Sequence, residues 1–558
     1  MNTINKRIVF VNFLVIVSSF VILSRFFYIQ IISHEKLKKY AENEYERKTT
    51  EIMPRGGIYD INGKLLASSI VKWDVVIMKK EFNKYEELDK LSKILSIPLK
   101  ELKDKINKGK NYRKIKKLVE KDAYEQISSL NLKGVLLEPH QTRIYPTELA
   151  REIIGVSNEN TGLTQTEAVM NDYLKGNIVT KEVIKDSKGN IIKTINEFSD
   201  KIPSKIYLTV EEEIQSFVES ALEKYYADLN CKNIIILVQN IENGFLSALG
   251  AYPKDYVNLK PFEFVYEPGS TFKTIILSAG FEENKIEEDD YIDCEKGSWK
   301  VNQKHTITDH EPLGNTKLTE VYAHSSNIGF AKIGLKIGIE KLYPYIKKFG
   351  FDSKYTNFPG ESKGIVKDFK KYKDIDVITT SYGYGIAVTP LQLINAYTSI
   401  ANGGILLKPH VIYKIQDEKK EIEFKREEIR RTVSEQTARR VTEMMINVVE
   451  FGTGVNAQIP GYFVAGKTGT ANKLDLKTGK YIKGENITSF CGFFPAKNPK
   501  YSILVIVDSS KKYKYGGQTA APIFQEIARQ IISLKNIKPE REIDYSKIKK
   551  KKSVEILN

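Results

Sequence analysis

The chain has 558 residues, 41% of them hydrophobic, and a formal net charge of +16 at pH 7. This length exceeds the usual size of a single domain, and the hydrophobic content excludes a wholly disordered chain. So positive a charge suits a nucleic-acid-binding protein, a protein that lies near anionic lipids or wall polymers, or simply a lysine-rich solvated surface.

The first predicted element is a membrane anchor. Residues 8–24 carry no charge, and Arg25 alone interrupts the apolar segment 8–32. A membrane span needs about 20 mostly apolar residues, and the segment reaches that length because an arginine can extend to the interface. Lys6 and Arg7 favour a cytoplasmic N-terminus, and no small-residue cleavage site follows. We therefore expect an uncleaved anchor rather than a buried core helix, with the remaining chain outside the cytoplasm and no nucleic-acid partner.

The next region mixes short elements. Residues 33–48 are charged and helix-forming, and residues 55–63 end in an Asn-Gly turn that predicts a β-hairpin. Residues 84–130 have helical periodicity, and residues 141–200 alternate short strands with turns. We place a domain boundary at Pro203.

After residue 204, strands occur at both ends of the region and helices lie between them. A strand at 206–210 leads into a helix at 211–226, and an amphipathic helix follows at 522–534. The other predicted strands are 234–238, 244–250, 462–465, 488–494 and 501–507. Because these strands come from distant parts of the chain, we predict a mixed α/β (α+β) domain with one sheet and helices around it.

A Ser-x-x-Lys motif is formed by Ser270 and Lys273. This spacing places a hydroxyl and an amine one helical turn apart, so that a neutral lysine can accept the serine proton. The motif alone is weak, because this lysine-rich chain contains at least three other matches. The context separates this copy from the others. Pro268-Gly269 can place the serine at a helix start, and the apolar residues 275–277 predict a buried helix.

A second motif is Ser325-Ser326-Asn327, which alone reads as a polar helix start. Its hydroxyl could pass on a proton and its amide could hold a substrate amide.

The third motif is Lys467-Thr468-Gly469-Thr470, on or at the end of the strand 462–465. Its glycine permits close approach of the backbone to a ligand. A second Lys-Thr-Gly, at 477–479, lies in a charged stretch and is interpreted as a loop turn.

The three motifs in this order are the signature of active-serine penicillin-recognising enzymes. The surrounding sequence resembles class B penicillin-binding proteins over nearly the whole exported chain. The similar segments in the C-terminal half are 266–273, 382–385, 389–392, 401–404, 465–470 and 516–524. Those in the N-terminal half are 55–60, 143–146 and 161–176.

The resemblance implies a penicillin-binding transpeptidase fold, with an antiparallel sheet flanked by helices, an elongated N-terminal pedestal domain and a single transmembrane anchor. We place the cytoplasmic N-terminus and anchor at 1–32, the pedestal or dimerisation domain at 33–203, the transpeptidase domain at 204–538 and a basic tail at 539–558. No segment resembles a glycosyltransferase, so polymerisation of glycan strands is not implied.

The resemblance also implies a mechanism. Ser270 attacks the D-Ala-D-Ala bond of a peptidoglycan stem peptide and forms an acyl-enzyme. Lys273 is the general base, and the positive charge of Lys467, together with burial, lowers its proton affinity. Ser325 passes a proton to the leaving amine, and Asn327 orients the base and the substrate amide.

Substrate binding is implied in the same way. Thr468 and Thr470, with Lys467, hold the substrate carboxylate beside Gly469. The N–H groups of Ser270 and Thr470 form the oxyanion hole. An amine of a neighbouring stem peptide resolves the acyl-enzyme, and β-lactams occupy the same site and stay attached. The enzyme is expected at the cell membrane as a single-pass protein with partners in a wall-synthesis complex, including a glycan polymerase. The family pattern requires no cofactor.

Four further residues raise the possibility of a Zn²⁺ site. Asp309, His310, His324 and Cys491 are an acceptable tetrahedral ligand set near the second and third motifs. Surface histidines and a buried cysteine are the alternative, which we favour because dispersed ligands give no spacing signature.

Two other functions remain open at this point. A β-lactamase or β-lactam sensor would use the same three motifs, but the N-terminal domain and the absence of a placed glutamate to activate water argue against it. A scaffold of a wall-synthesis complex needs no catalysis, and the intact motif set argues against a purely structural role.

Overall fold

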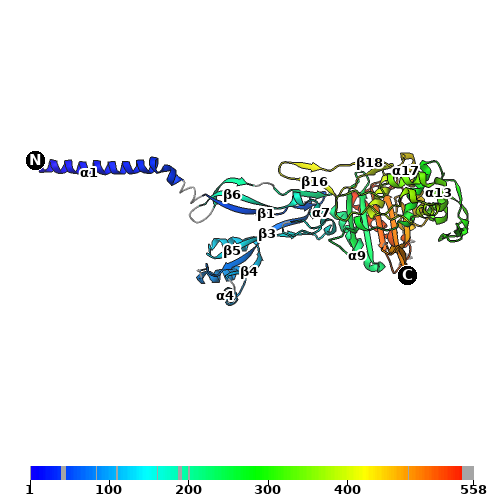
Figure 1. The fold of residues 1–558 in the computed structure, drawn as a ribbon, viewed down its shortest axis with the longest axis horizontal. Helices are drawn as coiled ribbons and strands as arrows, with labels where there is room; N and C mark the ends of the chain where they lie inside the picture. Colours follow the sequence, from blue (N-terminus) through cyan, green and yellow to red (C-terminus); the bar gives the residue numbers. More distant parts are fainter. Residues whose placement is uncertain are drawn as a thin grey trace. The chain divides into compact units, whose positions relative to one another are not determined.

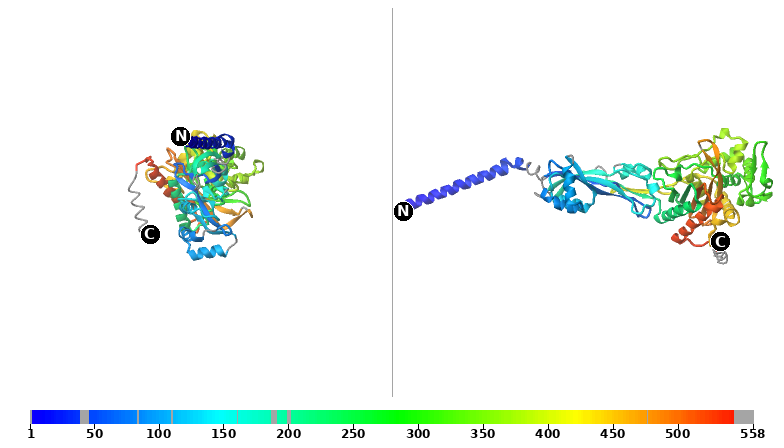
Figure 2. Two further views of the ribbon diagram at one scale, coloured as in Figure 1. Left: turned by 90° about the vertical axis from the view of Figure 1, so that its left-hand side faces the viewer. Right: turned by 90° about the horizontal axis from the view of Figure 1, so that it is seen from below.

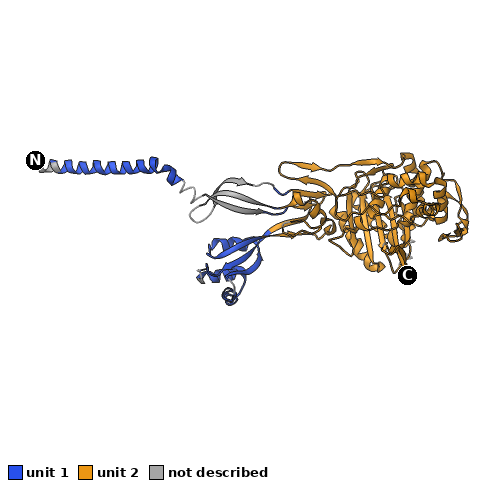
Figure 3. Ribbon diagram, viewed as in Figure 1, with its two compact units in different colours: residues 1–55, 71–139, 176–203 blue, residues 56–70, 140–175, 204–558 orange. Residues whose placement is uncertain are grey.

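The computed structural model describes residues 2–38, 46–82, 85–108, 111–159, 161–185, 191–198, 202–475 and 477–542. They form two compact units, coloured separately in Figure 3. The first unit combines residues 1–55, 71–139 and 176–203, and the second combines residues 56–70, 140–175 and 204–558. The domain boundaries set from the sequence remain predictions, and the end of the basic tail lies outside the described residues.

The N-terminal helix has the properties of a membrane span. Helix α1 (Asn2–Phe27) continues into a π-helical turn, Tyr28–Ile32. The segment Arg7–Ile32 is long and apolar enough to cross a bilayer, and its most apolar window has no buried residue in this structure. Apolar side chains that remain exposed along a whole helix require an apolar environment, which a bilayer supplies.

The rest of the first unit contains two small sheets. Strands β1 (Glu46–Met53), β6 (Asn177–Lys185) and β7 (Ile191–Phe198) pair antiparallel in that order. The C-terminal part of β3 (Leu65–Met78) pairs with β4 (Tyr112–Val119), and β3 also pairs with β5 (Val135–Ile144). Helices α3 (Leu88–Leu95), α4 (Leu99–Asn107) and α5 (Lys121–Ser129) share a hydrophobic core with β3, β4 and β5.

One prediction for this region was wrong in part. The sequence predicted helical structure throughout residues 84–130, but β4 interrupts the helices. Pairing with β3 and burial of Ile115 and Val119 override the helical preference of its lysines.

The second unit is built on a five-stranded antiparallel sheet. Its strand order is β10 (Leu246–Tyr252), β9 (Asn233–Asn240), β21 (Tyr501–Asp508), β20 (Lys480–Phe494) and β19 (Ala465–Asp475). Figure 1 shows strands from the green and orange parts of the chain side by side, and Figure 2 shows the same chain from two other directions. This arrangement confirms the predicted antiparallel sheet of strands from distant parts of the chain.

Helices cover both faces of this sheet, which explains its continuous apolar strands. Alternate residues of β9 face opposite sides: Ile234 and Ile236 pack in one core, and Ile235 and Leu237 in the other. Helices α9 (Glu212–Leu229) and α18 (Gly516–Lys535) contribute to the first core, and α11 (Lys273–Glu282) and α16 (Pro390–Ala401) to the second.

A further sheet of the second unit has the order β17, β16, β8, β2 and the first part of β3. The predicted hairpin is confirmed, because β2 (Ile58–Tyr59) pairs with β3 across a turn that contains Gly63 at φ +87°. The remaining elements of this unit are α6 (Arg151–Ile154), α7 (Gln165–Val169), α8 (Asn171–Leu174), β8 (Lys205–Leu208), α10 (Lys260–Glu263), β11 (Tyr291–Asp293), β12 (Ser298–Lys300), β13 (Thr306–Thr308), β14 (Asn315–Lys317), α12 (Leu318–Ala323), α13 (Asn327–Ile337), α14 (Ile339–Lys348), α15 (Asp374–Ser381), β15 (Ile405–Leu407), β16 (Ile412–Gln416), β17 (Glu421–Glu423), β18 (Glu428–Arg431) and α17 (Glu435–Glu450).

Candidate active site

Ser270 lies in a 3₁₀ turn, Gly269–Phe272, that leads directly into α11. Pro268 precedes the turn, and Gly269 has φ +56°, a conformation that a side chain would strain. A side chain at Gly269 would also approach the carbonyl oxygen of Thr470 to 2.9 Å. The turn thus places the serine, which is half-buried between buried neighbours, against the strand that carries the third motif.

Lys273 is fully buried at the start of α11. Its Nζ donates to the carbonyl oxygen of Ser325 at 2.6 Å, to Ser325 Oγ at 3.2 Å and to Asn327 Oδ1 at 2.9 Å. Burial lowers the pKa of Lys273 to about 7, against an opposing effect of the Asp309 carboxylate. About half of the lysine is therefore neutral near pH 7, as a general base requires.

Lys467 is the second buried amine of the site. Its Nζ donates to Ser325 Oγ at 2.9 Å. Burial lowers the pKa of Lys467 well below its usual value, and the charge of Lys273 lowers it further. The resemblance led us to expect that the charge of Lys467, together with burial, lowers the pKa of Lys273, but burial alone lowers it, and repulsion between the two amines acts on the pKa of Lys467. A hydroxyl that accepts from two amines is left to donate its own proton to a third group.

The second motif is positioned by its backbone. Ser325 lies between α12 and α13 with φ +64°, a strained conformation for a residue with a side chain. Asn327 is the first residue of α13; its Oδ1 accepts from Lys273 and its Nδ2 donates to the carbonyl oxygen of Thr308 at 3.1 Å. These two bonds fix the amide in one orientation.

The third motif lies within β19 rather than at the end of an earlier strand. The strand begins at Ala465, so that Lys467 pairs with Cys491 and Gly469 with Ser489. β19 is an edge strand, and every second N–H group of an edge strand is available to a ligand. A side chain at Gly469 would clash with Ser489 Oγ and come within 3.0 Å of the carbonyl oxygen of Pro268. The glycine therefore allows β19 to lie directly against the serine turn.

The two threonine hydroxyls of this motif already have partners. Thr468 Oγ1 lies 2.6 Å from Thr453 Oγ1, and Thr470 Oγ1 accepts from the N–H of Gly516 at 3.3 Å. Because Thr470 accepts there, its own proton remains available to a bound carboxylate. The second Lys-Thr-Gly sequence is a turn at the far end of the β19–β20 hairpin, as predicted, with Gly479 at φ +67°.

The four residues considered as a possible zinc site do not come together. Within the described parts of the chain, no three His, Cys, Asp or Glu residues come together to hold a metal ion. Asp309 instead accepts from the N–H groups of Asn327 at 2.5 Å and Ile328 at 3.1 Å, and its other oxygen accepts from Ser326 Oγ. It therefore caps α13, because the first N–H groups of a helix have no partner within the helix.

The other three proposed ligands have separate environments. His324 contacts Glu311 at 2.8 Å and Glu320 at 3.2 Å. His310 packs edge-on against Tyr515, with ring centroids 4.7 Å apart. The Cys491 side chain is buried in the core of the sheet, which raises the pKa of its thiol.

Sequence reasoning missed a buried hydroxyl network beneath the serine turn. Thr274 Oγ1 lies 2.8 Å from the Tyr322 hydroxyl and 2.7 Å from the Tyr397 hydroxyl. The Tyr397 hydroxyl donates to the carbonyl oxygen of Thr271 at 2.7 Å. The network joins three helices directly behind the nucleophile. No local motif indicates it, because its members are up to 126 positions apart.

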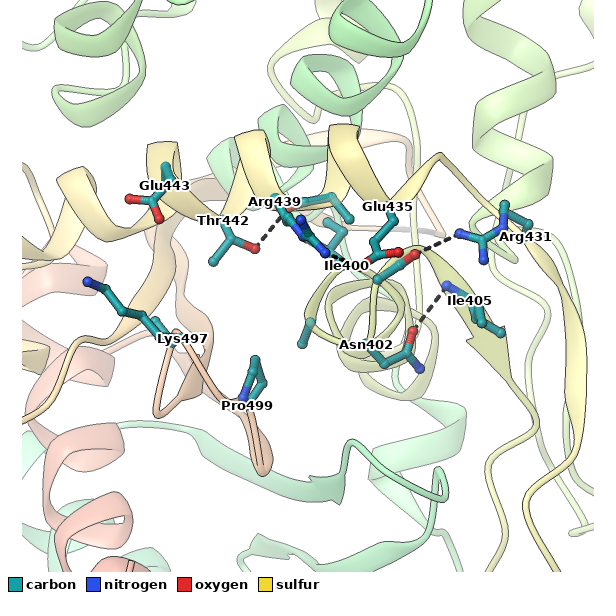
Figure 4. Close-up of a pocket in the computed structure, with 14 residues that line it drawn as sticks. Ile400, Asn402, Ile405, Arg431, Glu435, Arg439, Thr442, Glu443, Lys497 and Pro499 are labelled. Atoms are coloured by element: carbon teal, nitrogen blue, oxygen red, sulfur yellow. Dashed lines mark hydrogen bonds and ion pairs between the residues drawn. The ribbon is translucent and has the colours of Figure 1, made fainter. Parts of the chain in front are cut away.

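A separate pocket of about 660 Å³ lies elsewhere in the second unit (Figure 4). It is lined by the end of α16 with Asn402, the first half of α17, and the segment 496–499. None of the motif residues borders it, so it is not part of the catalytic cleft.

Comparisons with known proteins agree with this geometry. The family model for the penicillin binding protein transpeptidase domain matches residues 233–529. The model for the penicillin-binding protein dimerisation domain matches residues 50–208.

Curated relatives are similar over almost the whole chain. Stage V sporulation protein D of Bacillus subtilis strain 168 is 31% identical, over 97% of this chain and 87% of the relative. Peptidoglycan D,D-transpeptidase FtsI of Buchnera aphidicola subsp. Schizaphis graminum is 32% identical, over 96% of this chain and 97% of the relative. Among solved structures, penicillin binding protein 2X from Streptococcus thermophilus has the same fold, with a TM-score of 0.76, 24% identity, and coverage of 88% of this chain and 80% of that one.

Proposed function

Because the chain belongs to the class B penicillin-binding proteins, we propose that Ser270 is the nucleophile through which it cross-links peptidoglycan. The protein is a peptidoglycan D,D-transpeptidase, a serine-type acyl transferase of a family that binds β-lactams. The observation that carries the residue assignment is the Ser325 hydroxyl, which accepts from two buried amines, one of them that of Lys273 at the end of the turn that carries Ser270.

In the first half-reaction, neutral Lys273 removes the proton of Ser270 Oγ, which attacks the carbonyl carbon of the penultimate D-alanine. N–H groups of Ser270 and Thr470 stabilise the negative oxygen that develops. Collapse of the tetrahedral intermediate breaks the peptide bond, and the leaving amine takes a proton through Ser325. The acyl group is then an ester of Ser270, and the shared proton has moved from serine to the departing D-alanine.

The donor peptide is proposed to bind along the edge of β19. Lys467 and the hydroxyls of Thr468 and Thr470 are proposed to bind its terminal carboxylate, and an extended peptide can use the unpaired N–H groups of the strand. Asn327 holds Lys273 in place and is proposed to receive the substrate amide with its remaining proton. The reaction as drawn needs no metal or other cofactor, because serine, lysine and backbone groups perform each proton transfer.

In the second half-reaction, an amine of a neighbouring stem peptide attacks the ester. The new amide bond forms, the ester bond to Ser270 breaks, and the amine proton returns to Ser270 Oγ through Lys273. A β-lactam follows only the first half, because its amine stays tethered to the acyl group. The transpeptidase and dimerisation matches together favour this role over a β-lactamase, a sensor or a scaffold without catalysis.

We further propose that the helix Arg7–Ile32 anchors the protein in the cell membrane as a single pass, with the chain after residue 32 outside the cytoplasm. Its apolar length and the preceding Lys6 support this topology. Such an anchor would hold the enzyme beside membrane partners of a wall-synthesis complex, including a glycan polymerase. Deletion of residues 1–32 should release the protein from the membrane fraction while β-lactam labelling continues.

The nucleophile assignment is tested with a labelled β-lactam. Ser270→Ala should abolish covalent labelling, since it removes the only atom that forms the ester. Ser278→Ala is the matched control, because Ser278 lies on α11, directly after the turn that carries Ser270, with its hydroxyl bonded to the Thr274 carbonyl oxygen. Labelling of the Ser270 variant at the wild-type stoichiometry would contradict the assignment.

A further inference from the structure

Two loops of the second unit meet through an aromatic contact that the mechanism does not use. The rings of His310 and Tyr515 pack edge-on, with an interplanar angle of 79°. Both side chains are exposed, and 43% of Tyr515 is accessible to solvent. Two exposed rings that contact each other form a bridge on the surface rather than a part of the core.

Each ring belongs to a loop that is bonded to a catalytic motif. The neighbour of His310 is Asp309, which accepts from the N–H of Asn327 in the second motif. The neighbour of Tyr515 is Gly516, whose N–H donates to Thr470 Oγ1 in the third motif. The contact therefore connects the loops that hold the second and third motifs.

The loop that carries Tyr515 is strongly basic. All residues from Lys511 to Tyr515 are exposed. Lys512 forms an ion pair with Asp228, but Lys511 and Lys514 have no ion-pair partner in the parts of the chain that the structure describes. Tyr513 is also 40% exposed. Two exposed cations without an ion-pair partner, on the same loop as two exposed aromatic rings, suit a ligand that has carboxylates and an extended backbone or sugar face.

The second half-reaction requires a second substrate whose amine reaches Lys273. The attacking amine must lose its proton to Lys273, which is held by Ser325 and Asn327. An acceptor strand therefore approaches the ester beside the second motif, whereas the donor lies along β19. The stem peptide of a neighbouring glycan strand carries free carboxylates, which complement unpaired lysines.

We propose that the rim formed by His310, Tyr515, Lys511 and Lys514 is the docking surface for the acceptor stem peptide. This inference rests on the proposed function and adds where the second substrate binds. The aromatic bridge holds the two loops together, and the lysines attract the carboxylates of the acceptor. Surface charges of this kind act mainly on recognition of the partner and on its rate of association.

The test separates acceptor binding from acylation. Wild-type protein and Lys511→Glu/Lys514→Glu are given a small thioester donor and two acceptors, a carboxylate-bearing stem peptide with a free amine and uncharged glycinamide. The ratio of aminolysis to hydrolysis is measured against acceptor concentration. Lys419→Glu/Lys425→Glu is the matched control, because these lysines are also exposed and unpaired among the described residues and give the same change in net charge.

The variant at the rim should need about tenfold more of the carboxylate-bearing acceptor for half-maximal aminolysis, since two attractions become repulsions. Glycinamide should show no such change, and salt near 0.5 M should reduce the difference because the charges are exposed. An unchanged dependence on the stem peptide would overturn the inference. An equal loss with both acceptors would also overturn it, since it would indicate a disturbed catalytic site. Failure of wild-type protein to be acylated would instead reject the proposed function.

Discussion

Asp309→Asn is the sharpest test of how the second motif and the general base are coupled. Asp309 caps α13 and its charge acts on Lys273, whose pKa burial lowers to about 7. Because the carboxylate opposes the effect of burial, the isosteric amide should lower the pKa of Lys273 further. Asparagine keeps an oxygen that can accept from Asn327 and Ile328, so the change removes charge more than shape.

The sign of the effect follows from the role of the lysine. Lys273 accepts a proton only when neutral, so acylation is fast above its pKa and declines as the pH falls through about 7. One pH unit below the pKa, about a tenth of the lysine is neutral, and the rate should be about tenfold lower. In the variant this decline should occur at lower pH. Loss of a charged cap should also reduce stability by about 1 kcal/mol.

The assay is the second-order rate constant of acylation by a chromogenic β-lactam from pH 5 to 9, with thermal unfolding measured in parallel. Glu311→Gln is the matched control. Glu311 lies two positions after Asp309, and the substitution removes the same negative charge, but the Glu311 carboxylate contacts His324 instead of capping α13. The pH at which the acylation rate falls to half of its maximum does not depend on the maximum itself, so a variant with a lower maximal rate can still be compared with the wild type. A midpoint that stays in place or rises in the Asp309 variant would refute the electrostatic reasoning.

Three further substitutions test the packing of the site. Gly469→Ala should reduce acylation by about 100-fold or more, measured with the same β-lactam, because the new methyl group pushes β19 away from Pro268 and the serine turn. Ser325→Ala should lower the acylation rate by about 10²–10⁴-fold while circular dichroism remains unchanged, since it removes the hydroxyl between the two amines. Thr274→Val should destabilise the protein by about 1–3 kcal/mol in denaturant unfolding, because two buried tyrosine hydroxyls lose a partner; an unchanged midpoint would show that they find other partners.

The lysines and serines proposed as catalytic form patterns that can be read locally in the sequence. Ser270 is followed by Lys273 one helical turn later, and Pro268-Gly269 encodes the turn that exposes the hydroxyl. The order of the three motifs then indicates which of the several Ser-x-x-Lys sequences in the chain belongs to the site. The uninterrupted apolar run of β9 is also a local feature of the sequence, and it fits a strand whose two faces are both buried, one in each core.

The parts that sequence reasoning missed depend on contacts between distant positions. Asp309 looked like a metal ligand beside His310, but its partners are N–H groups 18 and 19 positions away. Every residue except proline has a backbone N–H group, so the sequence does not show which N–H groups an acidic side chain will bind. A carboxylate that caps a distant helix therefore looks like any other acidic residue in a loop. Strand β4 was missed for a similar reason, because its conformation is set by β3 rather than by its own lysines.

The two buried lysines have a consequence for the stability of the whole catalytic unit. An amine that loses hydration without a carboxylate partner disfavours the folded state, and Lys273 and Lys467 contact only neutral oxygens in the described hydrogen bonds. Burial of the two amines thus lowers the free energy of unfolding of this unit, and the surrounding hydrophobic cores must offset that loss. An acyl group that brings a carboxylate to Lys467 relieves this strain, so the inhibited enzyme should be the more heat-resistant form. Variants selected for escape from β-lactams would then tend to alter the folding equilibrium as well as the reaction.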